Sequence, residues 1–285
     1  MNWILLASGS AFFAGITAVL AKIGIRNVNS NLATAIRTIV VLVFSWLMVF
    51  IKGSQTGLAD IDARSLVFLV LSGLATGASW LCYFKALQLG DVNKVAPVDK
   101  SSTVLTVLLA FLFLGEPVTL YEGIGIVGIA LGTWLMIEKK ESTEEVSRAW
   151  LVYALLSAVF ASLTSILGKV GIEGVDSTLG TAIRTIVVLF MAWLVVFIQK
   201  TESQIGDIDR HSWIYLILSG LTTGLSWLCF YAALQTGPAS VVLPIDKLSI
   251  LVTIFFSWIL LKEKLLARSA IGLVILTAGT LCMLL

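Results

Sequence analysis

Charge is scarce in this chain. Charged residues make up 13% of its 285 residues, about half of the roughly 25% usual in soluble domains. The net charge of +2 provides no basic excess for binding nucleic acid. His211 is the single histidine, and the three cysteines show no disulfide or metal-ligand spacing. An ordinary cytosolic enzyme and a disulfide-rich secreted module are therefore excluded, and we expect no metal and no cofactor.

Apolar residues dominate instead, at 58% of the chain. They gather in runs close to the about 20 residues that a helix needs to cross the hydrocarbon core. In lipid the backbone must satisfy its own hydrogen bonds, so these runs are predicted to be helices. The ten predicted spans are 3–21, 32–51, 66–89, 92–114, 120–137, 150–168, 179–198, 213–235, 239–261 and 267–285. The predicted fold class is all-α integral membrane, in a multi-pass protein of the plasma or inner membrane.

The chain contains an internal repeat. A shift of 147 positions aligns residues 3–138 with 150–285 without a gap, and 61 of these 136 positions are identical. Residues 34–42 return unchanged as 181–189, and Ser79-Trp80-Leu81-Cys82 returns as residues 226–229. Such identity indicates duplication and fusion. The predicted units are a first five-helix repeat at 1–138, a charged linker at 139–149 and a second five-helix repeat at 150–285.

Each predicted unit has five spans, an odd number, so the second unit is expected to enter the membrane from the face opposite the first. Two inverted five-helix repeats are a recurrent plan of secondary transporters, because exchanging the conformations of two similar halves changes which side is open. The loops after spans 1, 3, 5, 7 and 9, with the adjoining helix ends, hold 14 of the 19 Lys and Arg residues. The positive-inside rule then places these loops in the cytoplasm and both termini outside.

An Asp-Lys pair follows a proline early in two of the spans. Pro97, Asp99 and Lys100 lie in span 4, and Pro244, Asp246 and Lys247 lie in span 9. At 1.5 Å per residue the aspartates are about 10 Å deep, where an ionisable side chain is costly unless paired or hydrated. The prolines are expected to kink the helices and free a backbone carbonyl. We interpret these residues as substrate or ion ligands; an Asp–Lys pair that only fixes helix packing is the alternative.

Two further residue types have repeat-related copies within the spans. Arg37 and Arg184 are either charge partners, such as Arg37 for Asp99, anion contacts, or cations that snorkel to the head groups. Trp80 and Trp227 fall at mid-span, away from the interfacial belt. Trp80 shares a helix face with Tyr83, and this face is suited to stack a planar or cationic substrate. Core packing explains the tryptophans equally well.

The chain lacks a P-loop, an HExxH motif and a nucleophile elbow. We therefore predict that it is not an enzyme. Without an ATP site, transport would be facilitated or coupled to an ion gradient.

The motifs together resemble the EamA-type branch of the drug/metabolite transporter superfamily. The resemblance covers both halves: an Arg early in spans 2 and 7, the segment Ala86-Leu87-Gln88-Leu89-Gly90, and the span ends Leu114-Gly115-Glu116-Pro117-Val118-Thr119 and Leu260-Leu261-Lys262-Glu263-Lys264-Leu265. It implies export of amino acids or other small metabolites through a cavity formed mainly by spans 3, 4, 8 and 9, with spans 1 and 6. The Asp-Lys pairs depart from the mostly neutral family pattern. Family members are usually drawn with both termini in the cytoplasm, opposite to the charge distribution.

The sequence thus predicts a secondary transporter that moves a small polar metabolite, such as an amino acid, outward by alternating access, with protons as a candidate coupling ion. Its expected partners are the small-molecule substrate, protons and membrane lipids, with no nucleic acid, and it would act as a monomer or homodimer. The alternatives are a lipid-linked or nucleotide-sugar type flippase or exchanger of the same fold, and a non-transporting membrane scaffold. A scaffold would pack the Asp-Lys positions shut.

Overall fold

The computed structural model describes residues 2–114, 119–137, 149–236 and 245–283, and in these ranges the regular structure is helical. The helices are α1 (Asn2–Gly24), α2 (Ser30–Lys52), α3 (Ala63–Leu89), α4 (Val92–Lys100), α5 (Ser102–Leu109), α6 (Leu120–Met136), α7 (Ala149–Gly171), α8 (Ser177–Ile198), α9 (Arg210–Thr236), α11 (Ser249–Phe256) and α12 (Ala267–Cys282). Short 3-10 helices η1 (Ser54–Asp60) and η3 (Glu202–Asp207) and π-helices η2 (Ala110–Leu114) and η4 (Ser257–Leu261) complete the described chain.

Seven helical segments in the described residues are long and apolar enough to cross a membrane. They are Trp3–Gly24, Ser30–Lys52, Ala63–Leu89, Val92–Phe113, Ala149–Gly171, Ser177–Ile198 and Arg210–Phe230. Helices α6 and α12 are shorter and also apolar. Large apolar side chains remain exposed on many helices, among them Phe113 at 73% and Val274 at 67% exposed. An outer surface of this kind is suited to lipid, so the structure is that of a helical integral membrane protein.

Polar residues at the helix starts fix where the long helices begin. The Asn29 side chain accepts hydrogen bonds from the first turn of α2, and its repeat-related residue Asp176 does the same for α8. Asp62 and Asp209, also related by the repeat, accept from the backbone N–H of Ser65 and Ser212 at the start of α3 and α9. Such caps satisfy backbone N–H groups that have no partner within the helix.

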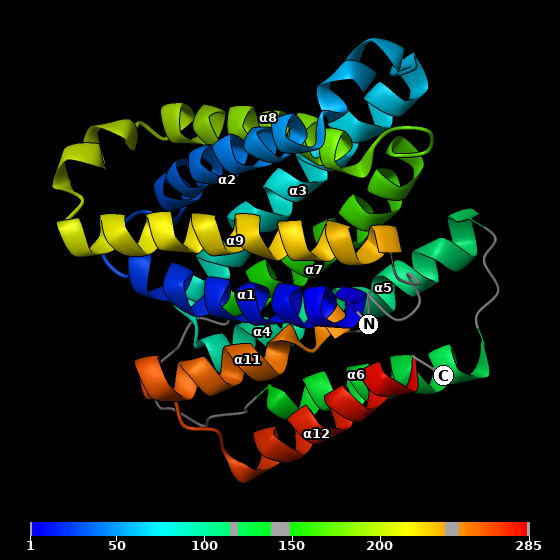
Figure 1. Ribbon diagram of the computed structural model, residues 1–285. Coiled ribbons are helices and arrows are strands. Elements are labelled where there is room, and N and C mark those ends of the chain that lie inside the picture. Colours follow the sequence, from blue (N-terminus) through cyan, green and yellow to red (C-terminus); the bar gives the residue numbers. More distant parts are fainter. Residues whose placement is uncertain (1, 115–118, 138–148, 237–244, 284–285) are drawn as a thin grey trace.

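The helices pack in pairs that combine the two halves of the sequence (Figure 1). Helix α1 packs on α9, and α3 packs on α7, which is the same pairing with the halves exchanged. Helices α2 and α8 pack at one edge of the molecule, and α6 and α12 pack together at the opposite edge. Helices of both halves therefore share hydrophobic core: Leu87 and Leu216, for example, lie in the same buried cluster.

Predicted span 4 is divided into shorter helices. Helix α4 continues through Pro97 to Lys100, and the interruption falls at Ser101, whose backbone N–H bonds to the Pro97 carbonyl. The kink expected at Pro97 is thus displaced by four residues toward the end of the helix. Beyond the break the chain runs as α5 and then as the π-helix η2. The corresponding proline, Pro244, lies outside the described residues.

Candidate functional site

Trp80 and Trp227 are in contact. We call the region around them the central site. They occupy equivalent positions of α3 and α9, and their ring centroids are 5.8 Å apart at an interplanar angle of 37°. Both side chains are half-buried. Because each is the repeat-related copy of the other, this contact lies where the two halves of the chain face one another.

The two aspartates make equivalent contacts across the halves. Asp99 accepts a 2.9 Å hydrogen bond from the Ser157 hydroxyl of α7, and Asp246 accepts a 2.6 Å bond from the Ser10 hydroxyl of α1. Ser10 and Ser157 are themselves related by the repeat. Each also contacts a serine of the neighbouring long helix, with Ser226 and Ser79 as the respective partners. An ionised carboxylate can accept about four hydrogen bonds, so both aspartates retain acceptor capacity beyond the serine.

The lysines of the Asp-Lys pairs are close to the same carboxylates. Lys247 lies within electrostatic range of Lys100 and of both Asp99 and Asp246. All four side chains are half-buried. Tyr83 is also half-buried and lies within range of Asp99. Two carboxylates, two ammonium groups and an aromatic pair from both halves thus gather in one region.

Arg37 is buried in protein and does not snorkel to the head groups. Its side chain is 1% exposed. The guanidinium donates to the Ser219 hydroxyl at 2.5 Å and to the Thr223 hydroxyl at 3.1 Å, both on α9, and stacks over the Phe84 ring at 4.1 Å. The contact with Asp99 considered from the sequence is replaced by these neutral partners. Arg37 therefore joins α2 to α9.

Arg184 has the same type of partner with the halves exchanged. It donates a 3.0 Å hydrogen bond to the Thr76 hydroxyl of α3, where Thr76 is the repeat-related copy of Thr223. Its side chain is half-buried, whereas that of Arg37 is fully buried. Both arginines thus form hydrogen bonds that join neighbouring helices. A contact between either arginine and the substrate remains a prediction.

Glycines set the close approach of these helices. A Cβ added at Gly73 of α3 would lie 2.8 Å from Val187 Cβ, and one added at Gly220 of α9 would lie 2.8 Å from Val40 Cβ. Van der Waals contact between carbon atoms requires about 3.5 Å or more. Glycine at these positions therefore permits tight helix packing.

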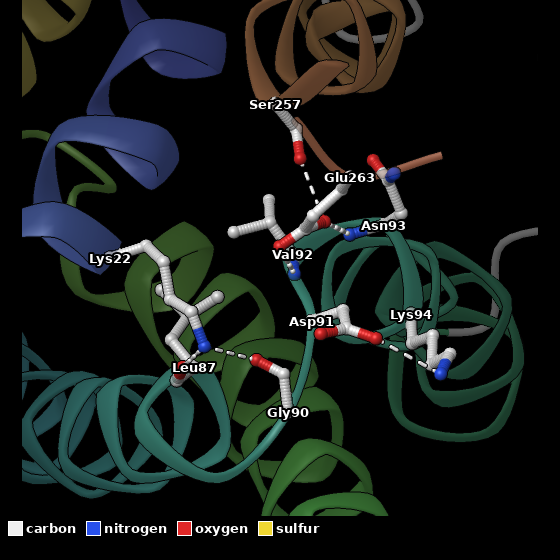
Figure 2. A network of polar contacts seen from close by, with 9 residues as sticks. All are labelled: Lys22, Leu87, Gly90, Asp91, Val92, Asn93, Lys94, Ser257 and Glu263. Atoms are coloured by element: carbon white, nitrogen blue, oxygen red, sulfur yellow. Dashed lines mark hydrogen bonds and ion pairs between the residues drawn. The ribbon is translucent and has the colours of Figure 1, made fainter. Parts of the chain in front are cut away.

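Glu263 bridges the halves at one end of the molecule. Its carboxylate accepts from the backbone N–H of Val92 and of Asn93, each at 3.0 Å, and from the Ser257 hydroxyl at 2.7 Å (Figure 2). Lys262 has a φ of 56°, a left-handed conformation that ends η4 and reverses the chain just before Glu263. A carboxylate is favoured at the positive N-terminal end of a helix, here α4. We call this set of contacts the Glu263 bridge.

Lys22 closes the neighbouring helix end. Its ammonium group donates to the carbonyl oxygens of Leu87 and Gly90, at the last turn of α3 and just beyond it (Figure 2). Lys22 thus caps the C-terminal end of α3. Neither Lys22 nor Glu263 was predicted as a site residue. The repetition of Glu116 as Glu263 was the available signal, but its partners Val92 and Asn93 lie 171 and 170 positions away.

Comparison with known proteins identifies the class. The model of the EamA-like transporter family matches residues 1–138 and 148–285. An uncharacterized transporter in the cobO 3′ region of Sinorhizobium sp is 47% identical over 135 residues, which cover 47% of this chain and 96% of that relative. The uncharacterized transporter YxxF of Bacillus subtilis (strain 168) is 28% identical over 173 residues, covering 58% of this chain and 54% of the relative.

A solved crystal structure of a protein shares the fold. It covers 99% of this chain and 97% of its own with a TM-score of 0.65, at 16% sequence identity. Together with the apolar helices, these matches define a multi-pass helical transporter of a cell membrane. The chain belongs to the EamA-like transporter family, in the drug/metabolite transporter superfamily.

Proposed function

We propose that this chain exports a small polar metabolite, such as an amino acid, by alternating access, with the substrate between the two halves. The observation that carries the proposal is the gathering of repeat-related ionisable side chains, Asp99 with Lys100 and Asp246 with Lys247, around the Trp80–Trp227 contact. Charges of both signs beside an aromatic pair suit a zwitterion: its ammonium group would meet a carboxylate or an indole face, and its carboxylate a lysine.

The cost of the central charges supports a functional role. An ionisable side chain within the membrane is expensive unless it has partners. Each aspartate accepts one serine hydrogen bond in the described part of the chain and stays half-buried. A packing role alone would favour a neutral residue at these positions. A carboxylate that takes up a substrate cation or a proton in each cycle instead requires unused acceptor capacity on its oxygens.

The reciprocal contacts support an alternating mechanism. We propose that spans 1–5 and 6–10 form two inverted five-helix repeats, because the Asp–Ser, Ser–Ser and Arg–Thr contacts each have a counterpart with the halves exchanged. In this scheme the Glu263 bridge closes the face that carries the loops after spans 3 and 9. Release of Glu263 from α4 would open that face, while the central serine–aspartate contacts rearrange.

The test is uptake into proteoliposomes at different pH values by the Asp99→Asn, Asp246→Asn and double variants, with a panel of amino acids. The asparagine oxygen can still accept from Ser157 or Ser10, so the fold should be retained, with a cost of about 1 kcal/mol. We expect the pH dependence of uptake to be lost in at least one single variant. The matched controls are Asp60→Asn and Asp207→Asn, an exposed repeat-related pair in η1 and η3 that should leave uptake unchanged.

Two results would contradict the proposal. Unchanged pH dependence in both single variants and in the double variant, with intact protein, would remove proton coupling through these residues. If no zwitterion is taken up and a larger lipid-linked or nucleotide-bearing substrate is, the proposed substrate class is wrong.

A further inference from the structure

A polar pocket lies beside the Glu263 bridge, away from the central site. Its volume is about 150 Å³, comparable with a cavity that holds benzene and therefore large enough for about six non-hydrogen atoms. It lies between the start of α4, the end of α6 and the segment that joins η4 to α12. The lining residues are Asp91, Asn93, Lys94, Met136, Glu263, Lys264, Leu265 and Ser269.

Two buried polar side chains in this lining have unused hydrogen-bonding capacity. Asn93 is 7% exposed, and its amide nitrogen and oxygen both lack a partner within the described residues. Ser269 is 4% exposed, and its hydroxyl also lacks one there. Figure 2 shows the Asn93 amide beside the segment that follows Glu263. A buried amide or hydroxyl left unpaired costs about 1–3 kcal/mol, so these groups indicate a ligand with polar atoms.

The start of α12 adds unpaired backbone donors. Leu266 occupies the N-cap position and offers no side-chain hydrogen bond. The equivalent start of α6 has Thr119 and Glu122, which form a complete capping box. Leu266 and Ser269 are the repeat-related copies of these two residues. The box is therefore absent from α12, whose first backbone N–H groups have no acceptor within the helix.

Two lysines and two acidic residues line the pocket. Lys264 is exposed and brings a positive charge to it. The two acidic residues of the lining are already engaged: Asp91 pairs with Lys94 at 3.0 Å, and both Glu263 oxygens accept hydrogen bonds from α4 and Ser257. The Asn93 amide and the Ser269 hydroxyl lack partners within the described residues. Both groups, and the backbone N–H groups at a helix start, can bind an oxyanion.

Residues near the pocket are of the kinds found at the level of lipid head groups. It lies at the ends of apolar helices, and nearby Arg268 stacks at 5.1 Å over the ring of Trp134, which is 59% exposed. Tryptophan and arginine are typical of membrane interfaces. We propose that this pocket binds a phosphate group, contributed by a phospholipid head group or by a free phosphate, independently of the transported substrate.

The experiment measures the melting temperature of the delipidated full chain in detergent against increasing inorganic phosphate or dihexanoyl phosphatidylglycerol. Sodium chloride at equal ionic strength is the control. We expect a saturable rise with at least one phosphate-bearing probe. A rise with both probes means that the phosphate alone is recognised, and a rise with the lipid alone identifies the head group as the source.

Two variants locate the site. Asn93→Leu replaces the unpaired amide by an apolar side chain of similar size, so the protein without probe should be no less stable, while the apparent Kd for the probe should weaken at least tenfold. Leu266→Thr combined with Ser269→Glu transfers the α6 capping box to α12 and should also remove the rise. The absence of a saturable rise with either probe, or an unchanged Kd in both variants, would overturn the proposal.

Discussion

Repeat-related residues make matching contacts in one layer of this molecule and different contacts in another. In the layer around α3 and α9 the contacts come in matched pairs: Asp99 with Ser157 and Asp246 with Ser10, Gly73 against Val187 and Gly220 against Val40. At the starts of α6 and α12 the copies diverge, since Thr119 and Glu122 cap α6 whereas Leu266 and Ser269 leave α12 uncapped.

The difference separates two kinds of constraint. A central layer that must serve equally well in two exchanged conformations needs both copies of each contact. A helix end that faces one side of the membrane works in only one environment, so its two copies are free to differ. Variants of paired residues should accordingly have matched effects in the central layer and unequal effects at the helix ends.

The largest expected effect is on the glycines of the central layer. Gly73→Leu and Gly220→Leu should each destabilise the protein by about 2–3 kcal/mol, because a side chain at either position overlaps a facing valine. Melting temperatures in detergent should fall by similar amounts for the two variants. Gly123→Leu in α6 is the control, since nothing lies within 4 Å of a Cβ there. Clearly unequal losses at Gly73 and Gly220 would break the comparison.

A smaller effect is expected at the Glu263 bridge. Glu263→Gln removes the charge from three hydrogen bonds and from the start of α4, and should cost about 1–2 kcal/mol. Glu122→Gln should be nearly neutral, because glutamine also completes a capping box. Thermal unfolding of both variants measures the difference. Equal losses would show that the bridge contributes no more than an ordinary surface cap.

The smallest effect concerns the caps of α3 and α9. The hydrogen bond from Ser65 holds the pKa of Asp62 below its ordinary value, and that from Ser212 does so for Asp209. A carboxyl with a lowered pKa in the folded state stabilises the protein above its unfolded pKa of about 3.9, and this stability is lost as the pH falls through the folded pKa. The double variant Asp62→Asn, Asp209→Asn keeps the caps without titrating.

Its melting temperature should therefore decline less than that of the unmodified protein between about pH 5 and pH 2. The comparison requires melting curves of both proteins over this range. Parallel declines would mean that other carboxylates account for the whole acid response.

Much of the helical organisation was predictable, because apolar runs of about 20 residues have few alternatives in lipid. Runs such as 32–51 and 179–198 correspond closely to α2 and α8. The break at Ser101 was not predictable from Pro97 alone, because a proline removes one backbone donor but does not determine which following residue ends the helix.

The partners of the site residues were much less predictable. The sequence indicated that Asp99 and Arg37 need partners within the membrane, and it suggested each for the other. The structure pairs Asp99 with Ser157 and Arg37 with Ser219. Serines are common in these spans and nothing local marks the two that are used. The repeat predicts the partner of one copy only after the partner of the other copy is known.

The packing of α1 against α9 has a consequence for biogenesis. Ser10 contacts Ser226, which is synthesised 216 residues later. At about 5–20 residues per second, the first helix would wait about 10–40 s for its partner. During this interval its polar face must be sheltered by lipid head groups, by the insertion machinery or by provisional neighbours. Because such nonlocal pairs form late, the first half is most exposed to quality-control proteases just after its insertion.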